Sequence, residues 1–439
     1  MNLRKGLLFI GCLQLLIACN SSSIDVESDV DVVDSTTNQP NILLVIADDM
    51  GLDATPNYPE GTIKPHMPNL QSLMDSGVRF TNLWSYPVCS PTRASILTGK
   101  YGSKTGVQQV GDVINTSETT IQSFLKSNTA NAYASAIIGK WHLSNNASDP
   151  TVMGIDYFAG ILNGGVQSYT NWNFTENNVT TNSTEYTTTK FTDLAIDWID
   201  RQTKPWFLWL AYNAPHTPFH LAPNGLHSQG NLPTDSGSID ANPMPYYMSA
   251  IEALDTEFGR LLSSLTSEEK ANTLIIFIGD NGSPNQVAQS PYTRRKAKNS
   301  LYQGGVNVPL VVSGYGVART NDVEGALVHT TDLFTTIVSA AGVTTTSLEN
   351  SSSFYDLLSS SNSNNRSYTY TEIIVNGVKG YAIRNENYKL IKFENGDEEF
   401  YNLSSDAYEN SNLLLSGNLS TDAANAKSDL EAEAIRIRS

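Results

Sequence analysis

The chain has 439 residues, with 27 Lys and Arg against 44 Asp and Glu, which gives a formal net charge of −17. Hydrophobic residues make up 40% of the chain, so it can form a large core that needs no disulfide staples. The acidic balance argues against a general binder of nucleic acids or anionic membranes, because both ligands require a basic face.

The first 19 residues have the pattern of an export signal. Arg4 and Lys5 precede an apolar run over residues 6–18, which is too short to span a bilayer as a mature helix. The run ends in Leu-Ile-Ala-Cys at Cys19 and resembles a bacterial lipobox, in which the cysteine is lipidated and becomes the mature N-terminus. An ordinary cleaved signal peptide is the alternative. We expect an exported bacterial lipoprotein that is tethered to a membrane or cell surface or faces the periplasm.

Residues 20–39 are predicted to be a disordered tether, because they hold five acids, no base and many Ser and Thr. The chain has three cysteines, of which Cys12 leaves with the signal peptide and Cys19 carries the lipid. Cys89 then has no disulfide partner. A lone cysteine in an exported protein is buried, reactive or modified.

Apolar runs alternate with amphipathic segments from residue 40 onwards. We expect buried strands at residues 41–47, 134–139, 206–212, 273–279 and 308–312. Helical patterns lie between them, at residues 69–75, 191–200, 247–265 and 331–341. This alternation indicates an α/β fold, with helices on both faces of a sheet.

Two low-complexity segments, residues 171–190 and 344–367, are expected to be surface excursions. The first lies inside a catalytic domain of residues 40–343, and the second begins a C-terminal subdomain of residues 344–439. This subdomain is predicted to hold a small antiparallel sheet from strands at 371–375, 380–384, 388–393 and 398–403. A terminal helix is expected near residues 418–437.

Polar side chains follow several predicted strands, at the sheet edge where α/β proteins bind ligands. Asp48 and Asp49 follow the first strand, and Asp280 and Asn281 follow the fourth. These four oxygen ligands suit a hard divalent cation, and Ca²⁺ tolerates such an irregular set better than Mg²⁺. An Asp-Asp pair alone could be a helix cap or turn, but two acidic strand ends favour a metal.

Cys89 lies in the segment that reads Cys-Ser-Pro-Thr-Arg-Ala-Ser-Ile-Leu-Thr-Gly-Lys. Ser90 is a candidate helix cap, and Gly99 suits the helix end. Cys89 is then near a positive helix terminus, with Arg93 one turn away, which predicts an anion site. The alternative is a reduced structural cysteine on a core helix.

The Cys-x-Pro-x-Arg motif at Cys89 resembles that of the formylglycine-dependent (type I) sulfatases, in the alkaline-phosphatase-like superfamily. Further landmarks occur in order at residues 47–49, 139–142, 214–216, 279–282 and 298–309. The resemblance implies a large mixed, mainly parallel sheet between helices and a smaller C-terminal antiparallel sheet. It also implies that a maturase oxidises Cys89 to formylglycine.

The resemblance further implies roles for individual residues. The catalytic residues would be Cys89, Arg93, Lys140, His142, His216 and Lys298. The ligands of one Ca²⁺ would be Asp48, Asp49, Asp280, Asn281 and the formylglycine at Cys89. In the implied reaction the hydrated aldehyde attacks sulfur. The arginine and the two lysines spread the charge of the sulfuryl oxygens, and His216, with Lys298, protonates the leaving alkoxide. His142 then removes a proton from the second hydroxyl, and sulfate leaves.

The expected substrate is an extracellular sulfated polysaccharide or oligosaccharide, and small aryl sulfates are the alternative. A phosphomonoesterase or phosphodiesterase of the same fold is less favoured, because those enzymes typically use Ser or Thr and two zinc ions. A non-catalytic lipoprotein that binds sulfated glycans remains if Cys89 stays unmodified.

An acidic protein needs a locally basic cleft to bind a polyanion. Arg294 and Arg295 precede Lys298 and are predicted to contact substrate, although an ordinary solvated basic run is the alternative. His220 lies close in sequence to His216 and is a further candidate for the substrate pocket.

Overall fold

A computed structural model describes residues 39–344, 348, 350–361 and 366–439. The predicted signal peptide, Cys19, nearly all of the tether and parts of the second low-complexity segment lie outside the described residues. Residues Gln39–Ser439 form one compact unit. None of the described helices combines the length and apolar character needed to cross a bilayer.

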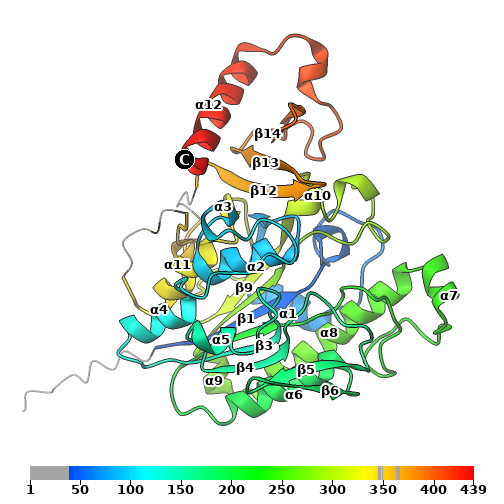
Figure 1. The fold of residues 1–439 in the computed structure, drawn as a ribbon, viewed down its shortest axis with the longest axis vertical. Coiled ribbons are helices and arrows are strands. Elements are labelled where there is room, and N and C mark those ends of the chain that lie inside the picture. The colour runs from blue at the N-terminus through cyan, green and yellow to red at the C-terminus, as the bar shows by residue number, and fades with distance from the viewer. Residues whose placement is uncertain (1–38, 345–347, 349, 362–365) are drawn as a thin grey trace, which may run out of the picture. The chain divides into compact units, whose positions relative to one another are not determined.

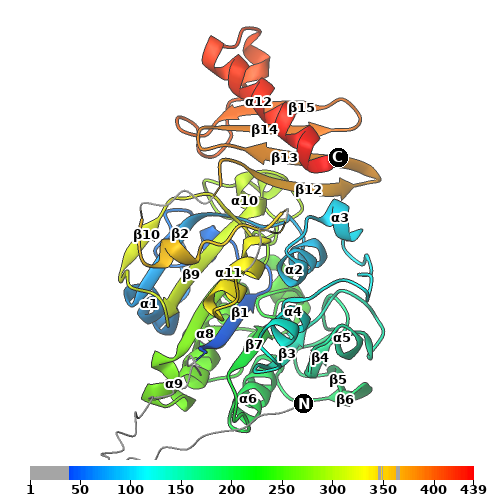
Figure 2. The same ribbon diagram turned by 90° about the vertical axis from the view of Figure 1, so that its left-hand side faces the viewer.

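The main sheet has eleven strands in the described part of the chain, in the order β10-β2-β9-β8-β1-β7-β3-β4-β5-β6, with β11 paired to β2 (Figures 1 and 2). Its central strands β8, β1, β7, β3 and β4 run parallel, whereas β9 runs antiparallel to β8 and β2. The five predicted strands and the mixed, mainly parallel sheet are thus confirmed. The strands are β1 (Asn41–Ala47), β2 (Gly77–Trp84), β3 (Ala134–Lys140), β4 (Tyr157–Ile161), β5 (Trp172–Glu176), β6 (Val179–Ser183), β7 (Trp206–Ala211), β8 (Thr273–Gly279), β9 (Asn307–Gly314), β10 (Asp322–Glu324) and β11 (Val328–His329).

Helices cover both faces of this sheet, which explains why its central strands are apolar without interruption. Leu43 and Val45 of β1 pack in one core with α6 and α8, while Ile42, Leu44 and Ile46 pack in the opposite core with α2, α4 and α11. The helices are α1 (Pro68–Asp75), α2 (Cys89–Thr98), α3 (Gly102–Thr105), α4 (Ile121–Asn128), α5 (Asp149–Val152), α6 (Thr187–Ile199), α7 (Ser236–Ala241), α8 (Met244–Ser264), α9 (Ser267–Ala271), α10 (Gln303–Val306), α11 (Asp332–Ala340) and α12 (Thr421–Arg438).

The C-terminal part forms the expected small antiparallel sheet, in the order β12-β13-β14-β15, with α12 lying across it (Figure 2). Leu430 and Ile437 of α12 pack on Leu390 and Phe400 of the sheet. The strands are β12 (Thr369–Val375), β13 (Val378–Arg384), β14 (Tyr388–Phe393) and β15 (Glu398–Asn402).

The first low-complexity segment is only in part the surface excursion that its composition predicts, since the first four residues of β6 are exposed. It forms the β5–β6 hairpin, which extends the main sheet beyond β4, and then the start of α6. Trp172 and Phe174 point into the core, while Asn173 between them is exposed. This period of two is the strand pattern, and the surrounding Thr and Asn residues obscured it.

Candidate active site

The candidate residues meet at the carboxyl edge of the parallel strands. Asp48 and Asp49 follow β1, Asp280 and Asn281 follow the neighbouring strand β8, and Lys140 is the last residue of β3. On the other side of β1, the turn after β7 carries His216. The sheet order β8-β1-β7-β3 therefore brings together residues that lie far apart in the sequence.

Cys89 lies at the start of α2, within its first turn. The helix begins at Cys89 itself, its N-cap residue is Val88, and no side chain caps it, so the expectation that Ser90 caps the helix is wrong. Gly99 ends the helix in a left-handed conformation, with a φ of 68°, as predicted. Cys89 is thus held at the positive end of a helix dipole, where developing negative charge is stabilised.

His142 is the closest polar partner of Cys89, since its Nδ1 lies 3.2 Å from the cysteine Sγ. The His142 backbone has a φ of 58°, which is unusual for a residue with a side chain. Its N–H donates to the carbonyl oxygen of Leu162 over 3.0 Å, and this contact holds the strained conformation. Strained backbone of this kind is frequent at functional sites.

Arg93 lies fully buried beside Cys89. Its Nη1 donates to the carbonyl oxygen of Lys140 over 2.9 Å, and its Nη2 donates to Asp280 Oδ2 over 2.8 Å. The guanidinium therefore fixes the ends of two different strands. Its Nε has no partner among the described residues.

Three buried carboxylates face three cations in this cluster. Lys140 Nζ donates to Asp48 Oδ2 over 2.6 Å, and Lys298 Nζ donates to Asp49 Oδ2 over 2.6 Å. The third carboxylate, Asp280, pairs with Arg93, so the formal charges of the six groups balance. A divalent cation added to this set would leave a surplus of two positive charges, which favours an anionic ligand.

The oxygen atoms of the cluster fit a divalent metal ion. Asp48 Oδ1 and Asn281 Oδ1 are buried and accept no hydrogen bond from the described residues. Ligand atoms of Asp48, Cys89 and Asp280 lie within 4.8 Å of one another. Unsatisfied buried oxygens are costly, and a cation between them would remove that cost. All of the predicted metal-ligand positions therefore lie in one cluster, with the Asp49 N–H donating to Asp280 Oδ1 over 2.9 Å.

Burial and neighbouring charges set the protonation states. Burial, with the cations Lys140 and Arg93, holds the pKa of His142 well below its usual value. Burial also lowers the pKa of His216, to about 4, although the nearby Asp49 opposes the shift. Both imidazoles are therefore neutral near pH 7 and able to accept a proton.

Burial raises the pKa of the Cys89 thiol, so an unmodified cysteine would remain a thiol and a weak nucleophile. Burial alone would raise the pKa of Asp49 and lower that of Lys298. Their mutual attraction, together with other nearby charges such as Lys140 and Asp48, outweighs burial, so the pKa of Asp49 falls and that of Lys298 rises. The pair is therefore an ionised carboxylate and a charged ammonium at neutral pH.

His216 and Lys298 form the open side of the cluster. Their side chains are 18% and 14% exposed, whereas those of Arg93 and Lys140 are fully buried. The Nδ1–H of His216 donates to the carbonyl oxygen of Thr217 over 2.7 Å, which leaves Nε2 facing Asp49 at 3.7 Å. A substrate would therefore approach from the side of His216 and Lys298.

The predicted substrate contacts differ in their surroundings. Arg294 and Arg295 lie on a short 3-10 helix (Arg294–Lys296), and both are exposed with no ion-pair partner among the described residues. His220 stacks on Tyr169 with ring centroids 3.8 Å apart, and its two ring nitrogens contact the Tyr186 hydroxyl and the Pro218 carbonyl oxygen. Both ring nitrogens of His220 therefore already have protein partners, and its role in substrate binding stays a prediction.

Two glycines that sequence reasoning missed lie against the candidate histidines. A Cβ atom at Gly164 would be 2.5 Å from the His142 ring, and one at Gly165 would be 3.4 Å from the His216 ring. The Gly-Gly pair one residue after an apolar run was the available signal, because it permits close approach of the backbone.

A second set of residues that the sequence did not reveal holds the backbone of Asp49 in place. Asp49 has a φ of 70°, and the Tyr247 hydroxyl donates to its carbonyl oxygen over 2.7 Å. Ser283 joins this network by donating to Asp53 over 2.6 Å and lying 3.1 Å from the Tyr247 hydroxyl. No sequence motif pointed to these residues.

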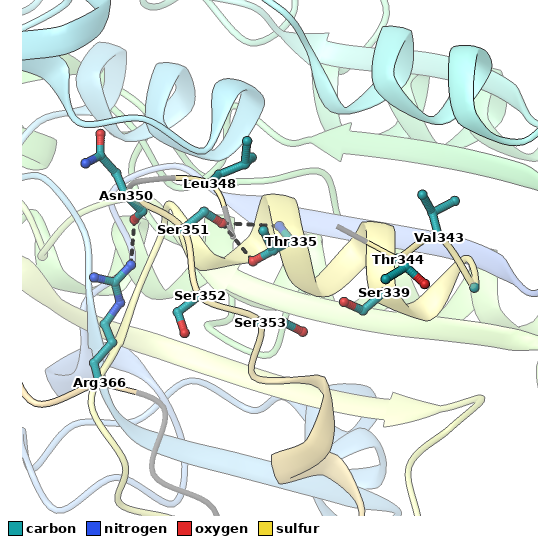
Figure 3. Close-up of a pocket in the computed structure, with 11 residues that line it drawn as sticks. Thr335, Ser339, Val343, Thr344, Leu348, Asn350, Ser351, Ser352, Ser353 and Arg366 are labelled. Carbon is teal, nitrogen blue, oxygen red and sulfur yellow. Dashed lines mark hydrogen bonds between the residues drawn. The ribbon is translucent and has the colours of Figure 1, made fainter. Parts of the chain in front are cut away.

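A cavity of about 730 Å³ lies elsewhere, beside α11 and the segment that follows it (Figure 3). Its polar groups mostly satisfy one another: Ser351 Oγ lies 2.8 Å from Thr335 Oγ, and Arg366 donates to the Asn350 carbonyl oxygen over 2.6 Å. Arg366 is also paired with Asp332. None of the candidate catalytic residues lines this cavity.

Comparison with known proteins agrees with this geometry. A family model described as Sulfatase matches residues 40–343, and one described as N-sulphoglucosamine sulphohydrolase, C-terminal, matches residues 296–435. The first match covers well over half of the chain. The chain therefore belongs to the sulfatase family, in the alkaline-phosphatase-like superfamily.

Its curated relatives include the Uncharacterized sulfatase YdeN of Escherichia coli (strain K12), which is 28% identical over 373 residues, 70% of this chain and 64% of the relative. Human N-acetylgalactosamine-6-sulfatase is 28% identical over 348 residues, 70% of this chain and 62% of the relative. The chain thus spans slightly less than two thirds of the length of these relatives.

Solved structures share the fold. Ps i-CgsB in complex with k-i-k-neocarrahexaose superposes with a TM-score of 0.76 at 23% identity, over 90% of this chain and 92% of that chain. A protein in complex with its substrate D-glucosamine-2-N,6-O-disulfate has a TM-score of 0.76 at 20% identity, over 91% of this chain and 98% of that chain.

Proposed function

We propose that this chain is a sulfuric ester hydrolase that uses a formylglycine derived from Cys89 and one calcium ion. The observation that carries the proposal is the cluster around Cys89, in which three carboxylates, three cations and two neutral histidines converge. Membership of the sulfatase family supports the same activity.

The metal would be held by Asp48, Asp49, Asp280 and Asn281, together with the group at position 89. When bound, it would supply positive charge for the sulfuryl oxygens, and formylglycine would supply a hydrated aldehyde as the nucleophile. Asp48 Oδ1 and Asn281 Oδ1, which are buried and accept no hydrogen bond from the described residues, are the features of this chain that favour such a cation.

The chain's own side chains then have separate tasks. Lys298 is charged and lies on the open side of the cluster, where it would hold a sulfuryl oxygen. Lys140 is fully buried and would add positive charge from inside the cluster. The departing alkoxide would take its proton from His216 acting with Lys298, because the resting His216 is neutral and the Lys298 ammonium beside the same carboxylate, Asp49, carries the proton. His142, neutral and within contact of position 89, would accept a proton there to complete the cycle.

The substrate we propose is a sulfated polysaccharide or oligosaccharide. One relative carries the name N-acetylgalactosamine-6-sulfatase, and two structural neighbours were solved with a carbohydrate. The exposed Arg294 and Arg295 near Lys298 would contact further sulfate groups of such a substrate. An arylsulfatase of broad specificity is the main alternative.

We further propose that the protein is exported and anchored through a lipidated Cys19. Substitution of Cys19 by Ser should move the protein from a fraction that requires detergent to a soluble one. Unchanged membrane retention would point to another anchor.

The activity is tested by co-expressing the chain with a formylglycine-generating maturase and assaying 4-methylumbelliferyl sulfate and 4-methylumbelliferyl phosphate side by side. We expect hydrolysis of the sulfate ester, its loss in Cys89→Ala and its loss on calcium chelation. Preferential hydrolysis of the phosphate ester, with two zinc ions bound, would refute the proposal in favour of a phosphoesterase.

A further inference from the structure

A groove lined by amide side chains runs away from the candidate active site. It consists of two cavities, of about 210 and 250 Å³, which share Asn145, Leu162 and Asn163 in their linings. The first also includes His142, and the second reaches Asn173 on the β5–β6 hairpin. The groove thus runs from the His142 side chain, which contacts Cys89, to the hairpin that extends the main sheet. Together its two parts, of about 210 and 250 Å³, fall within the ~300–1,000 Å³ typical of small-ligand sites.

The polar groups of this groove are available for a ligand. Asn145, Asn163, Gln167 and Asn173 are all exposed, and none of these four side chains has a hydrogen-bond partner among the described residues. A primary amide offers two donors and two acceptor lone pairs, so it can donate a hydrogen bond to a sugar hydroxyl or accept one from it.

The groove has no positive charge. Neither of its linings includes a Lys or Arg, and the one acidic side chain, Asp112, already accepts from the backbone N–H groups of Gln108 and Gln109. A sulfate or carboxylate on the ligand would therefore find no counter-ion there. The three cations of the catalytic cluster lie instead around position 89.

We propose that this amide groove is a subsite for a neutral, hydroxylated sugar unit that adjoins the sulfated unit of the substrate. The inference rests on the proposed sulfatase function and narrows its substrate to glycans in which an uncharged sugar neighbours the one that loses sulfate. The backbone at Gly164 links the two sites, because it packs directly on the His142 ring.

The test compares a double variant, Asn163→Ala with Asn173→Ala, against Asn418→Ala, which removes an exposed amide from the C-terminal part of the chain. Each enzyme, matured at position 89, is assayed on 4-methylumbelliferyl sulfate and on tetrasaccharides of κ-carrageenan, keratan sulfate, chondroitin 4-sulfate and chondroitin 6-sulfate. The first two present neutral neighbouring units and the last two present uronates. Melting temperatures verify that each variant is folded.

We expect the wild type to favour a tetrasaccharide with neutral neighbours. For each enzyme, kcat/KM for this tetrasaccharide is divided by kcat/KM for 4-methylumbelliferyl sulfate. This ratio should fall about tenfold in the double variant, as two lost hydrogen bonds imply, and stay constant in Asn418→Ala. The subsite is refuted if the ratio is unchanged, if only the chondroitin substrates are cleaved, or if the wild type hydrolyses the aryl sulfate and no tetrasaccharide. Failure of the matured enzyme on every sulfate ester would instead refute the proposed function.

Discussion

Substitution of Gly164 by Ala should disable catalysis without unfolding the protein. An added Cβ would lie 2.5 Å from both Cε1 and Nε2 of His142, whereas ordinary contacts between carbon atoms begin at about 3.5 Å. The His142 ring or the glycine segment must therefore move by about 1 Å. The φ of Gly164 is not in the left-handed region, so the change adds no backbone strain.

The displaced ring is the one that lies 3.2 Å from Cys89 Sγ. A misplacement of ~1 Å in a catalytic group can cost about 100-fold in rate, so we expect kcat on 4-methylumbelliferyl sulfate to fall by about that factor. The measurement is steady-state kinetics on the matured enzyme, with the content of aldehyde at position 89 verified for each variant.

Gly165→Ala is the matched control. Its Cβ would lie 3.4 Å from the His216 ring, which is close to ordinary contact, so kcat should stay within about twofold, equivalent to ~0.5 kcal/mol. Both variants should melt close to the wild type. A wild-type rate in Gly164→Ala, or equal losses in the two variants, would refute the role given to this contact.

Three further changes test other parts of the structure. Burial holds the pKa of His329 well below its usual value, so below pH ~6.5 only the unfolded chain protonates it, and stability should fall by up to ~1.4 kcal/mol per pH unit. Measured by urea unfolding, the free energy of unfolding of His329→Asn should fall less between pH 7 and 5 than that of the wild type. An equal fall in the two proteins would contradict this. Lys389→Met removes the 2.6 Å partner of buried Glu409 and should cost about 3–5 kcal/mol of unfolding free energy, part of which Glu409→Gln in the same chain should restore. Asp280→Ala should lower bound calcium, measured by elemental analysis, along with activity, whereas retained calcium would remove this residue from the ligand set.

Elements with a strong local pattern were predictable. The five apolar runs became β1, β3, β7, β8 and β9, because burial on both faces leaves an unbroken apolar sequence. The C-terminal sheet and α12 were also predictable from their short alternating and helical patterns. The β5–β6 hairpin was missed, since Thr and Asn surround the alternating Trp172 and Phe174 and resemble a loop in composition.

The site divides in the same way. Residues in recognisable motifs, such as Cys89, His142 and Asp280, do meet in space, because their motifs follow strands of the same sheet. Residues that support the site by binding the backbone of a site residue could not be inferred from the sequence. Tyr247 reaches the Asp49 carbonyl oxygen from α8, and only the folded chain brings these groups together across nearly two hundred residues.

The proposed activity depends on conversion of Cys89 to formylglycine, which mass spectrometry of the peptide that contains residue 89 measures. Preparations made with increasing amounts of maturase should contain increasing fractions of aldehyde at this position. Specific activity toward a sulfate ester should rise in proportion to the aldehyde fraction and be zero where only the thiol is present. Full activity in a preparation whose Cys89 is entirely an unmodified thiol would contradict this dependence.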